Sequence, residues 1–232
     1  MSNSLGVVIV AAGRGTRMGT VESKQYLLLR DKPIIVHTLE VFQQHELISE
    51  IVLVTGEEDV ARCREWIQLY RLDKVTAIVP GGSERQHSVH KGLLKLGTTW
   101  VMVHDGVRPF VHPSEIEACY ERAKQIGASV LAVPVKDTIK QVDSEGKVIS
   151  TPDRRSLWAI QTPQTFRLSD LLEAYEAADR EGFLGTDDAS LAERAGIAVS
   201  VVEGSYRNIK ITTPEDLDFA EFTESNRGEG QS

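Results

Sequence analysis

The sequence predicts an α/β fold: a Rossmann-like three-layer sandwich with a mostly parallel sheet, plus a protruding β-hairpin arm. Short apolar runs alternate with amphipathic segments, a glycine-rich loop follows the first run, and a polar alternating segment interrupts this pattern after Pro134. A length of 232 residues suits one domain with an appendage. We therefore expect a single domain over 1–224, an arm over 136–154 and a flexible tail over 225–232.

The expected strands and helices follow from hydrophobic periodicity. Runs of apolar, largely β-branched residues predict strands at 7–10, 51–55, 75–79, 101–104 and 129–133. The segments between them predict helices at 33–44, 57–70, 83–96 and 113–126. Strands that alternate with helices indicate a parallel sheet covered on both faces, with right-handed crossovers.

Several helix boundaries carry a local signal. Pro33 and Pro113 suit the first helical position, and Ser83 has a glutamine at capping-box spacing. Gly127 and Gly196 suit the left-handed conformation that commonly follows a helix. These residues therefore mark where helices begin and end.

After Pro134 the pattern changes. Polar and apolar residues alternate over 136–153 around the turn sequence Asp143–Gly146, which predicts a β-hairpin. The segment is too polar for the main sheet, so it is either a loose surface hairpin or an arm that packs on a second subunit, and we favour the arm. Helices near 169–180 and 187–195, a strand near 199–202 and a helix from Pro214 complete the expected fold.

Composition excludes several classes of protein. The net charge of −8 argues against general nucleic-acid binding, which needs a basic surface. No apolar run approaches the ~20 residues of a membrane helix, and the first residues do not resemble a signal peptide. Cys63 and Cys119 lie far apart in helix-like segments, so we expect free thiols and a cytoplasmic protein without membrane contact.

The loop after the first strand is the most informative segment. Glycines let backbone N–H groups approach a ligand, and neighbouring cations make a cradle for several phosphates. No Gly-Lys-Ser/Thr sequence closes the loop, which excludes a P-loop, and Met18 would block the packing of a dinucleotide site. Solvated charges on a plain turn are the alternative, which the acidity of the whole chain disfavours. The glycines and cations of this loop are Gly13, Arg14, Gly15, Arg17, Gly19 and Lys24.

Four further clusters are expected in loops. They are 80–88 after the third strand, 104–109 after the fourth, 151–155 with 161–164 at the base of the arm, and 208–214. The glycines of the first can present backbone groups to a flat ring or an anion. In the second, Asp105 can bind a sugar hydroxyl or help to position Mg²⁺.

The sequence shows no nucleophile or general base. There is no Ser/His/Asp or Cys/His arrangement, and no ligand set accompanies His87 and His90 that would make a zinc site. Transfer between phosphates needs mainly positioning and charge stabilisation. A phosphate monoester acceptor has a second pKa of about 6 and is largely a dianion at neutral pH, so it needs no base.

In this order and spacing, the clusters resemble those of the 2-C-methyl-D-erythritol 4-phosphate cytidylyltransferase family of the non-mevalonate isoprenoid pathway. The resemblance covers about 5–222. The motifs that carry it are Ala11-Ala12-Gly13-x-Gly15-x-Arg17-Met18-Gly19, Lys24-Gln25-Tyr26, Gly81-Gly82-x-x-Arg85-x-x-Ser88-Val89, His104-Asp105-x-x-Arg108-Pro109, Asp137-Thr138, Gln161-Thr162-Pro163-Gln164, Thr186-Asp187-Asp188 and Asn208-Ile209-Lys210.

The resemblance implies a reaction of CTP with methylerythritol phosphate, in which pyrophosphate leaves and Mg²⁺ assists. It implies a homodimer joined through 136–154, and Mg²⁺ held mainly by the CTP phosphates, with Asp105 as a candidate ligand. The implied catalytic residues are Arg17, Lys24 and Lys210. The implied CTP-binding residues are Ala11, Ala12, Gly13, Arg14, Gly15, Thr16, Gly82, Ser83, Ser88, Asp105 and Gly106. The implied substrate-binding residues are Asp105, Arg108, Thr138, Arg154, Thr162 and Lys210, with Thr138 and Arg154 reaching the site of the other subunit.

Two departures from the family pattern and two alternatives remain. Gly106 and Val107 stand where many relatives have two alanines, and Ser83 replaces an acidic residue found in some. A ribitol 5-phosphate cytidylyltransferase shares the chemistry, but its loop usually opens Ala-Gly-Gly, unlike the sequence from Ala11 here. A non-catalytic nucleotide-binding module would have little use for the cations Arg17 and Lys24.

Overall fold

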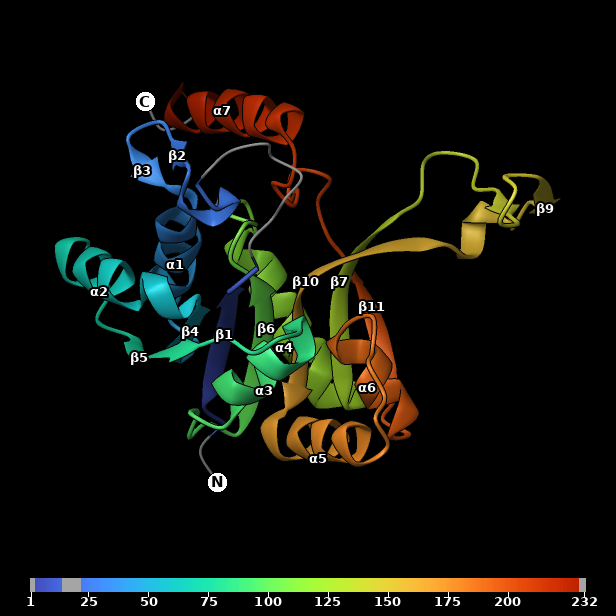
Figure 1. Ribbon diagram of the computed structural model, residues 1–232, viewed down its shortest axis with the longest axis horizontal. Helices are drawn as coiled ribbons and strands as arrows, with labels where there is room; N and C mark the ends of the chain where they lie inside the picture. Colours follow the sequence, from blue (N-terminus) through green and yellow to red (C-terminus); the bar gives the residue numbers. More distant parts are fainter. Residues whose placement is uncertain (1–2, 14–21, 230–232) are drawn as a thin grey trace.

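A seven-stranded sheet forms the centre of the protein, in the order β11-β7-β10-β6-β1-β4-β5 (Figure 1). The computed structural model describes residues 3–13 and 22–229. All neighbouring strands of this sheet are parallel except where β10 pairs with β6 and β7. This confirms the mostly parallel sheet. The strands are β1 (Leu5–Ala11), β4 (Ile48–Thr55), β5 (Val75–Pro80), β6 (Trp100–Asp105), β7 (Ala128–Pro134), β10 (Trp158–Arg167) and β11 (Val199–Glu203).

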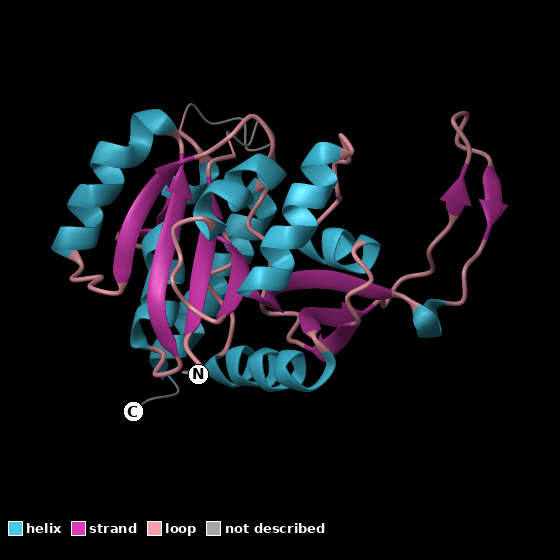
Figure 2. Ribbon diagram, turned by 90° about the horizontal axis from the view of Figure 1, so that it is seen from below, coloured by secondary structure: helices cyan, strands magenta, loops and turns pink. Residues whose placement is uncertain are grey.

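Helices cover both faces of the sheet (Figure 2), which confirms the three layers. Because successive strand residues point to opposite faces, Val7 and Ile9 of β1 join the core under α1, α2 and α4. Val8 between them joins the second core, under α3, α5 and α6. On the first face lie α1 (Ile34–Gln44), α2 (Val60–Leu69) and α4 (Pro113–Ile126); on the second lie α3 (Arg85–Leu93), α5 (Leu168–Arg180) and α6 (Asp188–Arg194).

A small third core joins the C-terminal helix to the body. Helix α7 (Pro214–Glu229) packs beside the short hairpin of β2 (Leu28–Leu29) and β3 (Lys32–Pro33). Its backbone is helical to residue 229 and so extends into the segment that we predict to be a flexible tail. The Ser225 hydroxyl donates to the Glu221 carbonyl, as it does in a regular helix. The buried members of this core are Leu29, Ile34, Val107, Phe110, Ile211 and Ala220.

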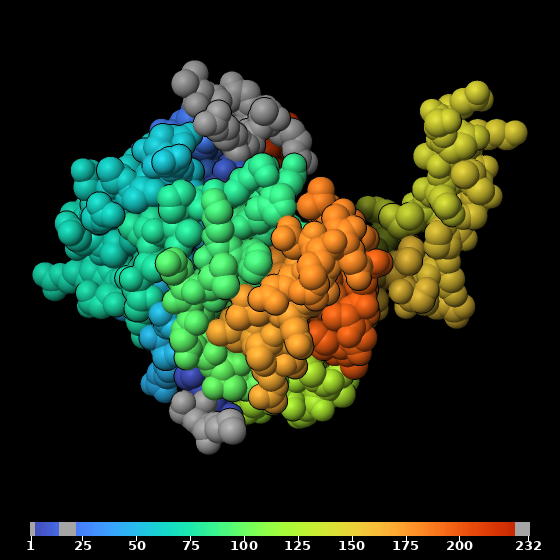
Figure 3. Space-filling model, turned by 60° about the horizontal axis from the view of Figure 1, so that its bottom comes forward, coloured from blue at the N-terminus to red at the C-terminus, as the bar shows by residue number. Residues whose placement is uncertain are grey.

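The predicted hairpin projects from the body as an arm (Figure 3). It contains β8 (Gln141–Val142) and β9 (Val148–Ser150), and η4 (Arg154–Ser156) follows. In the turn, the Asp143 carboxylate accepts hydrogen bonds from the backbone N–H groups of Glu145 (3.0 Å) and Lys147 (2.9 Å). Gly146 supplies the positive φ, 83°, that the turn requires. The sequence signal for this hairpin is therefore confirmed.

Strand β10 is the main element that the sequence pattern did not predict. Residues 161–164, which we expected in a loop, lie within it between β6 and β7. A proline inside an apolar run argues against a strand. Pro163 is accommodated because the pairing with β7 is interrupted between Ile160 and Gln164.

Two expected helix starts are also displaced. Helix α3 begins at Arg85, and Ser83 makes no capping bond; its hydroxyl instead bonds the His87 ring at 2.9 Å. Pro33 is extended, with φ −57° and ψ 140°, and precedes α1. Pro113 does open α4, and Gly127 and Gly196 have positive φ angles after helices, as expected.

Helix α3 lies against the sheet at Gly92, where the absence of a side chain allows close packing. A Cβ atom at Gly92 would lie 2.6 Å from Val8 Cγ1 and 2.8 Å from Val54 Cγ2. We expect Gly92→Val to overpack this contact and lower the free energy of unfolding by about 1–3 kcal/mol. Gly97→Val is the control, because nothing lies within 4 Å of its Cβ position, and should change it by less than about 0.5 kcal/mol. Urea unfolding measures both, and equal effects would contradict the packing argument.

Candidate active site

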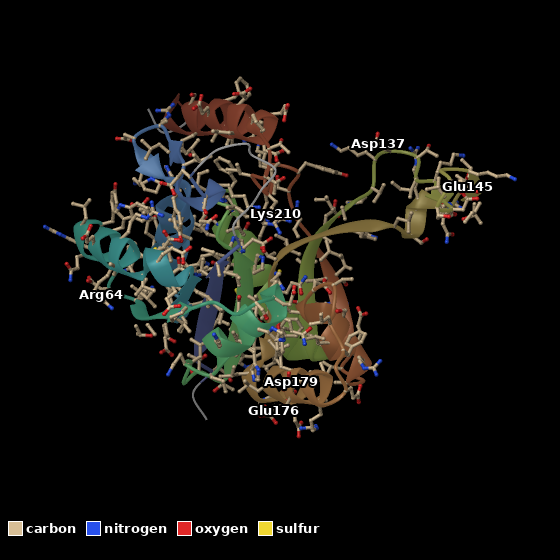
Figure 4. The ribbon with its side chains drawn as sticks, in the orientation of Figure 1. Arg64, Asp137, Glu145, Glu176, Asp179 and Lys210 are labelled. Carbon is tan, nitrogen blue, oxygen red and sulfur yellow. The ribbon has the colours of Figure 1, made fainter. Side chains whose placement is uncertain are left out.

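A cavity of about 470 Å³ opens beyond the carboxyl ends of β1 and β6, within the usual size range of small-ligand sites. Parallel α/β sheets bind their ligands at this edge. Figure 4 shows Lys210 near this edge, while the labelled arm residues Asp137 and Glu145 lie well away from it. The cavity is lined by Val10, Ala11, Ala12, Gly13, Lys24, Gln25, Gly82, Ser83, Glu84, Arg85, Ser88, Asp105, Val107 and Lys210.

The carboxylate of Asp105 is the centre of charge in this cavity. Its Oδ2 atom lies 3.1 Å from Lys210 Nζ and 3.1 Å from Arg108 Nε, and its Oδ1 lies 3.9 Å from Arg85 Nη2. Burial opposes ionisation of Asp105, but Lys210, Arg85 and Arg108 together hold its pKa well below the usual range. The carboxylate is therefore charged at neutral pH and is surrounded by cations.

A buried hydrogen-bond chain fixes the backbone of Asp105. Its N–H donates to Thr162 Oγ1 at 3.0 Å, and this hydroxyl lies 3.1 Å from His104 Nδ1. His104 Nε2 lies 3.0 Å from the Arg108 carbonyl, which can only accept a hydrogen bond. The ring therefore carries its proton on Nε2, and its Nδ1 accepts from Thr162. Burial lowers the pKa of His104 to about 4, so the ring is neutral at pH 7.

The segment that carries Lys210 is bound to the same cluster. Arg108 Nη1 donates to the Asn208 carbonyl at 2.8 Å, and Asn208 Nδ2 donates to the Thr162 carbonyl at 2.9 Å. The backbone N–H of Ile211 donates to the Val107 carbonyl at 3.0 Å. These bonds join three separate parts of the chain and hold Lys210 over Asp105.

Two loops with glycines close the other side of the cavity. A Cβ atom at Gly81 would lie 2.4 Å from Ala12 Cβ, so only glycine permits this approach of the loops. The N–H of Gly82 donates to Ser88 Oγ at 2.9 Å, and that hydroxyl donates to the Glu84 carbonyl at 3.1 Å. Ser88 thus shapes the loop from the first turn of α3.

The short helix η2 (Lys24–Tyr26) places Lys24 on the cavity wall. The buried Gln25 joins this helix to the end of β1, because its Nε2 donates to the carbonyl oxygens of Ala11 (2.7 Å) and Gly13 (3.2 Å). The beginning of the glycine loop and the residues after it are therefore held together.

Arg85 and Asp188 are site residues to which the sequence reasoning gave no role. The Arg85 guanidinium donates two hydrogen bonds to the Asp188 carboxylate, at 3.1 and 2.8 Å, while the same side chain reaches Asp105. Asp188 is fully buried and also accepts from the Tyr175 hydroxyl. Arg85 and Asp188 both belong to motifs that the chain shares with the family. Their place in these motifs was the signal in the sequence that could have identified them as site residues.

Of the 14 predicted residues that the structure describes, nine line the cavity: Ala11, Ala12, Gly13, Lys24, Gly82, Ser83, Ser88, Asp105 and Lys210. The other five lie elsewhere. Arg108 and Thr162 lie beneath Asp105, and Gly106 packs against β1, where its N–H donates to the Val10 carbonyl. Thr138 and Arg154 belong to the arm, where the Arg154 guanidinium donates to the Lys136 carbonyl. The predicted residues Arg14, Gly15, Thr16 and Arg17 lie outside the described residues.

The paired charges of Arg85 and Asp188 generate the second prediction. Asp188→Asn removes a buried negative charge and leaves the Arg85 guanidinium with a single neutral acceptor. We expect this change to lower the free energy of unfolding by about 3 kcal/mol. Glu181→Gln, which breaks the exposed Arg194–Glu181 pair, should cost less than about 1 kcal/mol. Denaturant titration compares the two variants. A loss for Asp188→Asn no larger than for Glu181→Gln would contradict the assignment.

Comparison with known proteins identifies the family. The 2-C-methyl-D-erythritol 4-phosphate cytidylyltransferase family model matches residues 5–225. The enzyme of that name from Geobacillus kaustophilus is 50% identical over 221 residues, covering 95% of this chain and 96% of the relative. That from Bacillus velezensis is 51% identical over 217 residues, covering 93% of each.

Solved structures agree with these relatives. The 4-diphosphocytidyl-2C-methyl-D-erythritol synthase of Anaerococcus prevotii superposes with a TM-score of 0.84 at 32% identity, covering 96% of each chain. The Thermus thermophilus cytidylyltransferase gives 0.80 at 30% identity, covering 96% of this chain and 99% of the other. The chain therefore belongs to the 2-C-methyl-D-erythritol 4-phosphate cytidylyltransferase family.

Proposed function

We propose that this protein transfers the cytidylyl group of CTP to 2-C-methyl-D-erythritol 4-phosphate, in the synthesis of isoprenoid precursors. The products are 4-diphosphocytidyl-2-C-methyl-D-erythritol and pyrophosphate. The observation that carries the proposal is the Asp105 cluster, a buried carboxylate with Lys210, Arg108 and Arg85 around it at the edge of the sheet where the glycine loop begins. Family membership supplies the identity of both substrates.

The reaction requires charge stabilisation rather than a base. The acceptor phosphate is largely a dianion at neutral pH, and its oxygen attacks the α-phosphorus of CTP in line while pyrophosphate leaves. Lys24 and Lys210 lie on the cavity wall, where their charges can stabilise the five-coordinate phosphorus. Arg17 is proposed to assist them. His104 takes no proton, because it is buried, neutral and hydrogen-bonded at both ring nitrogens.

The loops after β1 and β5 are proposed to bind different parts of the nucleotide. We assign the base to the Ala11–Ala12 turn and to Gly82, Ser83 and Ser88 on the facing loop. The backbone of Gly13 and the following loop residues would hold the β- and γ-phosphates. Asp105 would accept a hydrogen bond from a ribose or polyol hydroxyl, and its cations keep it ionised for that purpose.

A magnesium ion fits this cavity as a companion of the nucleotide. Among the described residues, no group of three or more His, Cys, Asp or Glu side chains could hold a metal. The carboxylates on the cavity wall are Asp105 and Glu84. Mg²⁺ commonly uses one or two carboxylates with substrate phosphates, so Asp105 Oδ1 is the proposed protein ligand. When bound, the ion would neutralise phosphate charge as pyrophosphate leaves.

The arm is proposed to join two copies of this chain in a homodimer. It stands away from its own body (Figure 3) and exposes apolar side chains, Val148 and Ile149 by 52% and 60%. Such a protruding apolar surface is typical of an interface. A second copy would cover it and bring Thr138 and Arg154 of the partner subunit toward the polyol phosphate.

We also propose that the protein is cytoplasmic and does not contact a membrane. Among the described residues, no helix combines the length and apolar character needed to cross a membrane. Cys63 and Cys119 are both buried, free thiols. Reduced cysteines are typical of the cytoplasm, where we place the protein.

Pyrophosphate release tests the proposed function. Purified protein with CTP and Mg²⁺ should release pyrophosphate with methylerythritol phosphate, because this is the acceptor for which the family is named. Ribitol 5-phosphate and a reaction without acceptor are the controls, and both should release at least tenfold less. Equal or faster release with ribitol 5-phosphate would contradict the substrate. A folded protein that binds CTP but releases nothing with either acceptor would contradict the reaction.

The arm generates its own prediction. Ile149→Asp places a charge in the proposed interface, and burying an unpaired charge is costly. We expect the dimer dissociation constant to rise at least tenfold, measured by sedimentation velocity over a protein concentration series. Leu69→Asp is the matched control, because Leu69 is also exposed but lies on α2, far from the arm. An unchanged dimer in Ile149→Asp, or a monomeric parent protein, would contradict the proposal.

A further inference from the structure

Arg62 on α2 lies outside the cavity, yet it contacts the residues on both sides of Lys24. Its Nη1 donates to Glu22 Oε2 at 2.9 Å, and its guanidinium lies over the Tyr26 ring, 4.1 Å from the ring centroid. A third contact, from Nη2 to the carboxylate of Asp59, fixes the guanidinium to the residue that precedes α2. One planar group therefore bridges the beginning of α2 and the segment that carries Lys24.

The Glu22 contact fixes the chain before Lys24. Glu22 Oε2 accepts from Arg62, and its Oε1 accepts from the backbone N–H of Ser23 at 3.2 Å. The Ser23 carbonyl in turn accepts from the Tyr26 N–H at 2.9 Å, which closes the turn around Lys24. The carboxylate thus connects Arg62 directly to the backbone that enters η2.

The Tyr26 contact fixes the chain after Lys24. Tyr26 is buried, packs against Trp66 of α2, and shares a hydrogen bond with the Thr55 hydroxyl at the end of β4. The Thr55 carbonyl accepts from the Gly81 N–H at 2.8 Å, so Tyr26 also connects to the loop that faces the base. Arg62 lies over the Tyr26 ring, and cation–π contacts of this kind stabilise a ring in place.

We propose that Arg62 is a positioning residue for Lys24, which it holds on the cavity wall by fixing Glu22 before it and Tyr26 after it. This inference rests on the proposed function, in which Lys24 stabilises the α-phosphate of CTP. A lysine side chain has four rotatable bonds, so its charge is useful only where the backbone beneath it is held. Displacement of a reacting group by about 1 Å can cost on the order of 100-fold in rate.

A matched pair of substitutions tests the inference. Arg62→Ala should lower kcat/KM for CTP on the order of 10- to 100-fold, and should lower kcat itself. Arg64→Ala is the control: Arg64 lies on the same helix but is exposed and points away from the body (Figure 4), and it should keep the parent rate. Arg62→Lys keeps the charge opposite Glu22 without the planar fork, and it should fall between the two.

A double-mutant cycle separates positioning from general stability. Lys24→Ala should lower kcat strongly, and adding Arg62→Ala to it should change the rate less than about twofold, because the group being positioned is gone. Glu22→Gln, at a side chain that is 45% exposed, should also lower kcat. If Arg62→Ala folds poorly, Glu22→Gln still tests the inference, because it weakens the same contact between Arg62 and the chain before Lys24.

The outcomes distinguish this inference from the function on which it rests. Parent protein that releases no pyrophosphate contradicts the proposed function. An active parent with Arg62→Ala as fast as Arg64→Ala contradicts the inference alone. Multiplicative losses in the cycle also contradict it, because they mean that Arg62 acts independently of Lys24. An active Lys24→Ala protein contradicts the role of Lys24, and the inference with it.

Discussion

The site depends on one ion cluster, the buried carboxylate of Asp105 with Lys210 and Arg108 on one oxygen and Arg85 near the other. Three cations gathered at one edge of the sheet would repel one another without an anion among them. A single carboxylate at their centre offsets that repulsion and fixes their directions. The cost of burying the carboxylate is offset by these cations. In the proposed function Lys210 also stabilises the α-phosphate, so one contact serves both stability and catalysis.

The topology explains how these groups meet. Asp105 ends β6, the neighbour of β1, so the cluster and the glycine loop lie at one edge of the sheet. The antiparallel strand β10 brings Thr162 beneath Asp105, and α6 begins with the Asp188 that holds Arg85. Each supporting residue is itself hydrogen-bonded and buried, which gives the rigid second layer that precise catalytic geometry requires.

Much of this could be predicted from the sequence, and the misses have physical causes. Local periodicity and turn chemistry predict the parallel strands, the helices on both faces of the sheet, and the hairpin. They are sufficient for these elements because each one has a regular pattern of apolar and polar residues or a typical turn sequence. Strand β10 was missed because Pro163 contradicts a strand locally and is tolerated only through a break in pairing with β7. Ser83 was misassigned as a cap because its hydroxyl has an alternative partner in His87. Arg85 and Asp188 are 103 positions apart, and spacing along a sequence carries no information about such a contact.

The most direct measurement compares turnover and CTP affinity in Asp105→Asn, with circular dichroism to check its fold. Asparagine keeps the shape of the side chain but removes the charge that organises Lys210, Arg108 and Arg85. The account predicts turnover lower by at least about 100-fold, as for loss of a preorganised electrostatic group. CTP affinity should fall less than turnover, because the asparagine oxygen can still accept a hydrogen bond from a ribose hydroxyl. A folded Asp105→Asn protein with the parent turnover would contradict the central place of this carboxylate.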